Sequence, residues 1–225
     1  MPIRTTPLVN NQYYHVYNRG VARNPTFFGK RDYERFINLL SYYRFTSPPL
    51  RFSKFLLQTV ENREKILHGL SGSSQEVSVC CYCLMPNHFH LLLRQMSDKG
   101  ISDFMKRVSD GFTKYINIKH KRVGPVFQGA FKAVRIESDE QLIHVSRYIH
   151  INPIVDFVVK TINDLLEYPW SSIKSYLYPE VNRFVDGETV LSQFSSREKY
   201  KEFILNQIDY AQTLREIKHL CFMEA

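Results

Sequence analysis

His88 and His90 are the residues of this sequence whose types and spacing are best suited to chemistry. They lie in PNHFHLLLR, residues 86–94, whose apolar residues predict a β-strand. Side chains at positions i and i+2 of a strand point to the same face, so the two imidazoles should lie side by side. Two imidazoles on a rigid strand make half of a divalent-metal site. The alternative is a pair of strand histidines that only face solvent.

A second candidate is Tyr148, in the segment QLIHVSRYIHINP at residues 141–153. The segment predicts a helix with an apolar stripe made of Leu142, Val145 and Ile149. Tyr148 lies roughly 120° from this stripe and shares a face with His144 and Asn152. A phenol and a carboxamide one turn apart can offer a nucleophile and an oxygen ligand to one metal ion. The alternative is a tyrosine at the core margin with its hydroxyl in water.

The two candidates together fit chemistry on a phosphodiester. The chain has 30 Lys and Arg against 22 Asp and Glu, a formal net charge of +8, which favours a polyanionic partner. Tyrosine is a poor nucleophile at neutral pH because its pKa is about 10. It becomes useful where a metal neutralises the phosphate and where the geometry of attack is fixed.

PNHFH flanked by apolar strand sequence, followed later by RYIHINP, resembles the motifs of the single-tyrosine HUH transposases of bacterial insertion sequences. YHVYNRG near the start and YPWSSIKSYL at residues 168–177 are similar to the REP-associated tyrosine transposase branch. The resemblance covers residues 12–178, apart from an insertion at 47–75.

This resemblance implies a ferredoxin-like α+β fold and a divalent metal, Mg or Mn, bound by His88, His90 and Asn152. Tyr148 would be the nucleophile. The implied reaction is cleavage and rejoining of single-stranded DNA at hairpin-flanked sites through a 5′-phosphotyrosine intermediate. Positions 144 and 152 are His and Asn, so the chain resembles the one-tyrosine enzymes rather than those with two tyrosines one turn apart.

The elements that must position these residues follow from hydrophobic periodicity. Strands are predicted at 12–19, 76–84, 88–94 and 126–136, with a turn at 85–87 that makes the second and third a hairpin. Helices are predicted at 31–45 and 101–118, and a third begins at the capping box of Ser138 and ends at Pro153. Because Asn152 precedes that proline, it is biased away from helical geometry. The order favours an antiparallel α+β architecture with helices packed on one sheet.

The remaining segments are read as additions to this fold. Residues 52–69 predict one weaker helix within the insertion, and 196–218 predict a helix near the end of the chain. We therefore expect a catalytic domain at 1–178 and a C-terminal helical extension at 179–225. DNA specificity and the choice between monomer and homodimer stay open.

Basic residues predict how the chain would bind nucleic acid. Between residues 99 and 122, seven Lys or Arg accompany two Asp, opposite the apolar stripe of the predicted helix. A solvated helix face would look similar. The functional interpretation is a phosphate track, a row of basic residues that binds successive phosphates of a DNA strand. Its candidates are Arg19, Arg94, Lys106, Arg107, Lys114, Lys132 and Arg135. Of Tyr13, Tyr14 and Tyr17, which are suited to stacking on bases, at least one should belong to the core.

Several other classes are disfavoured. Cys80, Cys81 and Cys83 lie in one apolar run, which suits a reducing cytoplasm, and the remaining cysteine is too distant for typical zinc-finger spacing. No apolar run is long enough to span a membrane, so we expect no membrane partner. The cysteines favour a cytoplasmic protein, and the resemblance implies a bacterial one. The competing function is a DNA- or RNA-binding protein on the same fold, including a domesticated transposase that has lost activity.

Overall fold

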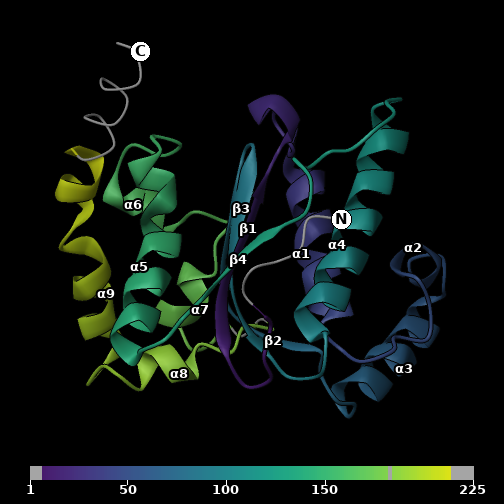
Figure 1. The fold of residues 1–225 in the computed structure, drawn as a ribbon, viewed down its shortest axis with the longest axis horizontal. Coiled ribbons are helices and arrows are strands. Elements are labelled where there is room, and N and C mark those ends of the chain that lie inside the picture. Colours follow the sequence, from purple (N-terminus) through teal and green to yellow (C-terminus); the bar gives the residue numbers. More distant parts are fainter. Residues whose placement is uncertain (1–6, 182–183, 214–225) are drawn as a thin grey trace. The chain divides into compact units, whose positions relative to one another are not determined.

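The structure is a computed structural model that describes residues 7–181 and 184–213. Its strands hydrogen-bond in the order β2-β3-β1-β4 (Figure 1). They are β1 (Tyr13–Arg19), β2 (Val77–Met85), β3 (His88–Gln95) and β4 (Lys132–Arg135). β1 and β4 are antiparallel, with Tyr14 opposite Arg135. The predicted α+β class is confirmed.

The described helices include one 3-10 turn and a series of α-helices. The 3-10 turn is Val21–Arg23. The α-helices are α1 (Lys30–Tyr43), α2 (Phe52–Phe55), α3 (Val60–Ser71), α4 (Gly100–Lys119), α5 (Asp139–Val155), α6 (Ile162–Leu166), α7 (Ile173–Leu177), α8 (Glu188–Leu191) and α9 (Arg197–Leu205). In the described part of the chain, no helix has the length and apolar character needed to cross a membrane.

The chain divides into two compact units. The first unit contains the described residues up to Ser78, together with Pro86–His88 and Leu93–Arg135. The second contains Val79–Met85, Phe89–Leu92 and the described residues from Ile136 onward. The expected domain boundary at residue 178 stays a prediction.

Two predicted elements differ in extent from those observed. The single helix expected at 52–69 is two helices, α2 and α3, because the Thr59 side chain accepts a hydrogen bond from the Asn62 amide and starts a new helix. The strand expected at 126–136 is only β4. Gly129 has a φ of +67°, a left-handed conformation that interrupts an extended chain before β4 begins.

The expectation that Pro153 ends its helix is wrong. α5 contains Pro153 and continues to Val155. Proline removes one helical hydrogen bond, but Ile151, Asn152, Pro153 and Ile154 are all buried, and this packing offsets the loss. Asn152 therefore remains helical, and its carbonyl accepts a hydrogen bond from the Asp156 amide at 2.9 Å. The one-turn relation between Tyr148 and Asn152 is preserved.

The last predicted helix, 196–218, is observed in part. α9 covers Arg197–Leu205, and its Ser196 side chain accepts a hydrogen bond from the Lys199 amide. Residues 214–218 lie outside the described residues.

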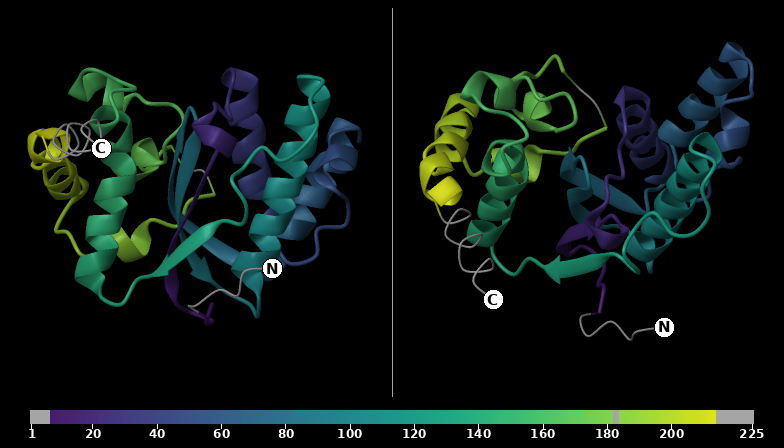
Figure 2. Two further views of the ribbon diagram at one scale, coloured as in Figure 1. Left: turned by 45° about the horizontal axis from the view of Figure 1, so that its top comes forward. Right: turned by 90° about the horizontal axis from the view of Figure 1, so that it is seen from above.

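The core of the first unit lies where α1 and α4 pack against each other, as the two views in Figure 2 also show. The rings of Phe27, Phe36, Phe112 and Phe127 form one cluster of tilted, stacked and edge-to-face contacts. Aromatic pairs of this kind contribute beyond the area they bury. Gly111 of α4 lets the helices approach, since a Cβ there would lie 3.2 Å from the Leu39 side chain.

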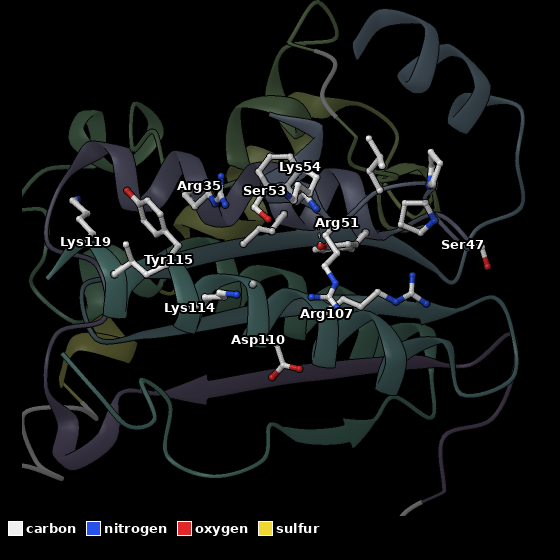
Figure 3. A pocket seen from close by; sticks show the side chains of 18 residues that line it. Arg35, Ser47, Arg51, Ser53, Lys54, Arg107, Asp110, Lys114, Tyr115 and Lys119 are labelled. Carbon is white, nitrogen blue, oxygen red and sulfur yellow. Dashed lines mark hydrogen bonds between the residues drawn. The ribbon is translucent and has the colours of Figure 1, made fainter. Parts of the chain in front are cut away.

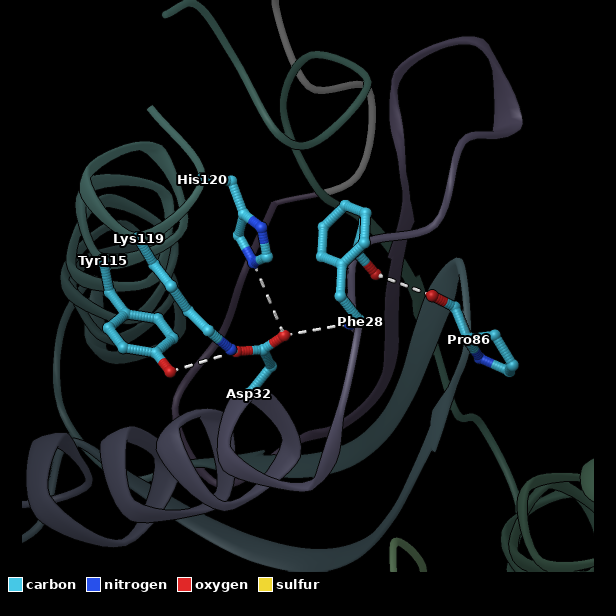
Figure 4. Close-up of polar contacts among 7 residues, drawn as sticks. Phe28, Asp32, Pro86, Tyr115, Lys119 and His120 are labelled. Carbon is cyan, nitrogen blue, oxygen red and sulfur yellow. Dashed lines mark hydrogen bonds and ion pairs between the residues drawn. The ribbon is translucent and has the colours of Figure 1, made fainter. Parts of the chain in front are cut away.

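A buried carboxylate, Asp32, ties α1 to α4 (Figure 4). Its side chain is fully buried and accepts hydrogen bonds from the Lys119 ammonium, the Tyr115 hydroxyl at 3.0 Å and the Phe28 amide at 2.9 Å. His120 lies 3.9 Å from the same carboxylate. Burial alone would raise the pKa of Asp32, but the hydrogen bonds from Lys119, Phe28 and Tyr115 outweigh it and hold the pKa below its usual value.

A buried histidine, His150, fixes α5 in the second unit. Its Nδ1 lies 2.7 Å from the Tyr200 hydroxyl on α9, and its Nε2 lies 2.8 Å from the Ser172 hydroxyl. Ser172 in turn is hydrogen-bonded to the backbone of Tyr82 in β2. Burial lowers the pKa of His150 to about 3, so the imidazole is neutral and both nitrogens are engaged. The helix is thereby tied to both β2 and α9.

Replacing Asp32 with asparagine should destabilise the first unit by about 3 kcal/mol at pH 7, because it leaves Lys119 without its carboxylate. Hydrogen exchange of the α1 and α4 amides measures the change. Because the pKa of Asp32 is lowered from 3.8, its contribution is present above that pH and is lost as the pH falls through the lowered value. Glu61→Gln, which removes an exposed ion pair with Lys65, is the control. Equal effects of the two substitutions would contradict this account.

His150 should make the second unit less stable as the pH falls below 6.5. The unfolded chain then takes up a proton that the buried imidazole cannot, which costs roughly 1.4 kcal/mol per pH unit. Denaturant unfolding followed by Trp170 fluorescence between pH 7 and 5 measures the slope. His150→Gln should flatten it, whereas His68→Gln, on an exposed position of α3, should not. An unchanged slope in His150→Gln would show that another group is responsible.

Candidate active site

The two-residue turn before β3 is held from several sides within the first unit. The Pro86 carbonyl accepts hydrogen bonds from the Thr26 and Phe27 amides, at 2.9 and 3.1 Å. The Asn87 carbonyl accepts one from the Gly20 amide at 2.7 Å. Gly20 is required by space, because a Cβ there would lie 2.1 Å from the carbonyl oxygen of Asn24. The YNRG segment, which ends β1 and includes Gly20, therefore fixes the point at which β3 starts.

Asn87 sets the tautomer of His88. Its side-chain nitrogen donates to the Arg23 carbonyl at 3.1 Å, which orients the amide so that Oδ1 faces His88. The distance from that oxygen to His88 Nδ1 is 2.7 Å. An amide oxygen only accepts, so Nδ1 carries the proton and the acceptor lone pair is on Nε2. This is the arrangement in which a histidine can ligate a metal through Nε2.

His88 and His90 occupy alternate positions of β3, so they lie on the same face of that strand, as the sequence predicts. His88 is partly exposed, whereas His90 retains only 6% of its accessible surface. The intervening Phe89 is fully buried and belongs to the opposite face. The pair is therefore not a solvated strand edge.

Within the second unit, the Tyr148 ring of α5 contacts the His90 ring. The two ring centroids are 5.3 Å apart, and the planes are almost perpendicular at 83°. Tyr148 keeps 46% of its surface exposed, although its neighbours Arg147 and Ile149 are buried. The phenol thus contacts one of the two strand histidines while it remains accessible to a large substrate. The prediction that it lies off the apolar side of the helix is confirmed.

Asn152 lies one turn beyond Tyr148 on α5 and is 2% exposed. His144, one turn before Tyr148, has another role. Its Nδ1 lies 2.6 Å from the Arg147 guanidinium, and since arginine only donates, that nitrogen is the acceptor. Arg147 also stacks on Phe203 at 4.3 Å, so this end of α5 is tied to α9. Of the two polar neighbours of Tyr148, Asn152 is the better candidate ligand.

The donor chemistry of these residues fits a hard or borderline divalent ion. Two imidazoles and one carboxamide oxygen would supply mixed N/O ligation and leave positions for phosphate oxygens. In the described part of the chain, no group of three or more His, Cys, Asp or Glu is clustered in a way that could hold a metal.

The expected phosphate track divides into anchored and exposed residues. Arg19 bonds Gln128, Arg94 stacks over Tyr13 at 5.6 Å, Arg107 pairs with Glu76, and Arg135 bonds Gln12. Lys106, Lys114 and Lys132 are exposed. Among the candidate stacking tyrosines, Tyr14 is fully buried and belongs to the core, whereas Tyr13 and Tyr17 are half-buried. The sequence did not reveal these partners of the four arginines, because each partner is distant in the chain.

Sequence reasoning also missed the residues that orient the candidates. Asn87 was read only as part of a turn, and His150 only as part of the RYIHINP motif. A signal for Asn87 was available, because a polar residue directly before a possible metal-binding histidine is placed to orient it. His150 carried no such signal, because its partners Ser172 and Tyr200 are distant in sequence.

Comparisons with known proteins show which fold and which family this chain resembles. A search of curated proteins found no match. A solved structure described as "Structure of the REP associates tyrosine transposase bound to a REP hairpin" is similar in fold. It has a TM-score of 0.55 and 14% sequence identity over 87% of this chain and 96% of that one. Residues 39–152 match the family described as "Transposase IS200 like". That match covers half of the chain and includes both strand histidines, Tyr148 and Asn152, so the protein belongs to the IS200-like transposase family.

Proposed function

We propose that this protein nicks and rejoins single-stranded DNA at hairpin-flanked sites, with Tyr148 as the nucleophile. The observation that carries the proposal is the contact between the exposed Tyr148 ring and the buried His90 ring. A phenol that is fixed by its helix, open to solvent and next to a candidate metal ligand has the properties that attack on a phosphodiester requires. The structurally similar protein is described as bound to a REP hairpin, which supports a hairpin substrate here.

In the proposed reaction, each phosphate ester bond that breaks is replaced by a new one. The Tyr148 oxygen attacks phosphorus as its proton leaves to solvent. The bond from phosphorus to the 3′ oxygen breaks, and that oxygen takes up a proton from solvent. The products are a 5′-phosphotyrosine and a 3′-hydroxyl. A second 3′-hydroxyl can reverse the step on another strand, so rejoining needs no ATP. The two hydrogen bonds of His150 hold α5, and with it the phenol, in place for both steps.

His88, His90 and Asn152 would hold the divalent ion, Mg or Mn. When bound, that ion supplies neutralisation of phosphate charge. The protein residues do the rest. Asn87 keeps the His88 acceptor on Nε2, and burial of His90 and Asn152 limits competition from water. The seven basic residues named above would bind the DNA backbone. We place the protein in the REP-associated branch and in a bacterial cytoplasm as part of the same proposal.

Tyr148→Phe should abolish covalent attachment to DNA, since it keeps the ring and removes only the hydroxyl. A hairpin substrate labelled on its 3′ side, incubated with wild type and Mn²⁺, should give a protein band that carries label through denaturation. Mass spectrometry of the digested adduct should identify the peptide that contains Tyr148. Tyr210→Phe, at another exposed tyrosine, is the matched control.

An adduct in Tyr148→Phe would mean that the nucleophile is another residue. If wild type binds hairpin DNA but forms no adduct with any hairpin tested, the protein is a binding protein on a transposase fold.

Metal binding should respond in a graded way to the residues at the start of β3. Asn87→Ala removes only the group that orients His88 and should weaken Mn²⁺ binding by about 10–100-fold. His88→Ala removes a ligand and should weaken it further. Isothermal titration measures both, with His68→Ala as the control. The assignment is contradicted if Asn87→Ala weakens Mn²⁺ binding more than His88→Ala does. It is also contradicted if neither variant differs from wild type.

A further inference from the structure

The first unit contains a large cavity that holds none of the residues proposed to cleave DNA, although Arg107 and Lys114 of its lining are also proposed to bind the DNA backbone (Figure 3). Its volume is about 1020 Å³, at the upper end of the range for small-molecule sites. The lining comes from α1, α4 and the segment 47–54. None of the lining residues belongs to a β-strand, and none is a candidate metal ligand or nucleophile.

The wall formed by residues 47–54 is rigid. Ser47 has a φ of +51°, and Pro48 and Pro49 follow it, so the backbone there has little freedom. The Tyr42 hydroxyl donates to the Leu50 carbonyl at 2.8 Å, and the Phe52 amide donates to the Tyr43 hydroxyl at 3.0 Å. These bonds join the segment to α1. The cavity is therefore formed before any ligand arrives, which lowers the entropy that binding must overcome.

The charge of the lining is strongly positive. It includes a single acidic residue, Asp110, against six basic residues: Arg35, Arg51, Lys54, Arg107, Lys114 and Lys119. Lys119 is paired with Asp32, and Arg107 is paired with Glu76. The other four have at most Asp110 to balance them within the lining. This excess attracts an anion.

Arg35 is the most constrained of these cations. Its guanidinium lies 4.7 Å from the centre of the Phe52 ring and 5.1 Å from that of Tyr115. Burial lowers the pKa of Arg35, and within the described residues its buried Nε has no hydrogen-bond partner. A partly desolvated arginine without a carboxylate partner is unfavourable by itself. An anion in the cavity would offset that.

The rest of the lining is apolar and partly aromatic. Leu39 and Tyr43 come from α1, Ile118 comes from α4, and Phe52 and the two prolines come from the opposite wall. Arg35 already covers the Phe52 ring, so a planar ring in the cavity would rest on the two prolines and the exposed Ile118. The ligand should therefore have both a concentrated negative charge and a planar ring.

We propose that this cavity binds a nucleoside phosphate, with its phosphates among Arg35, Arg51, Lys54 and Lys114 and its base on the apolar wall. A phosphate concentrates charge in one group and matches the fork of arginine. The same chemistry has two sources, a free nucleotide or an unpaired nucleotide of a DNA strand.

The test titrates the full chain with fluorescently labelled ADP and follows polarisation. Unlabelled ADP, pyrophosphate and adenosine serve as competitors. The double variant Lys54→Gln/Lys114→Gln changes two exposed side chains, so it should fold normally, and it should raise the Kd for ADP at least about tenfold. Arg35→Gln should do the same, with its folding checked by circular dichroism. The matched control is Lys30→Gln/Lys65→Gln, at exposed lysines outside the lining.

The source is identified by repeating the titrations with a short labelled oligothymidine. Weaker ADP binding in the pocket variants assigns the site to free nucleotides. Weaker binding of the oligonucleotide alone in Arg35→Gln assigns it to DNA, because Arg35 is not among the residues proposed to bind the DNA backbone. If binding of neither ligand is weakened more by the pocket variants than by the control, the proposal is wrong. It is also wrong if adenosine competes as well as ADP. His88→Ala should keep ADP binding, so failure of this proposal and of the cleavage proposal can be told apart.

Discussion

The imidazole of His150 is fully buried and engaged at both nitrogens, and α5 cannot rotate without breaking one of those hydrogen bonds. In an α-helix, residues two positions before and two positions after a given residue both project from roughly the opposite side. Tyr148 and Asn152 stand in this relation to His150. A structural hydrogen-bond network on one side of the helix therefore determines where the proposed nucleophile and a candidate ligand project from the other side.

The start of β3 is fixed with similar strictness by different means. The Gly20 amide donates to the Asn87 carbonyl, and a Cβ at Gly20 would clash with the Asn24 carbonyl. The Asn87 side-chain amide sets the proton on His88. The motif around Gly20 thus contributes through backbone contact and contains no reacting group. Each candidate catalytic side chain is held by neighbours that do not themselves take part in chemistry. This agrees with the general need for a supported site, because small errors in position reduce rates strongly.

The elements of the sheet and its helices were largely predictable because their apolar residues follow the periods of strands and helices. The errors arose where packing or local backbone geometry overrides local preference. Burial around Asn152 and Pro153 keeps α5 helical where sequence preference would end it, and Gly129 shortens β4. The cavity beside α1 and α4 was not predictable, since it depends on how residues 47–54 pack on α1. Likewise, nothing local in the sequence indicated that Arg107 is paired with Glu76 while Lys114 is exposed.

The central proposal is that His88, His90 and Asn152 hold one divalent ion for attack by the Tyr148 hydroxyl. Anomalous diffraction from crystals of the protein with hairpin DNA and Mn²⁺ tests it most directly. The account predicts one manganese peak within bonding distance of His88 Nε2, an imidazole nitrogen of His90 and the Asn152 side-chain oxygen. The Tyr148 oxygen should face the scissile phosphate at that ion. A manganese peak on other residues, or a Tyr148 side chain turned away from the DNA, would contradict it.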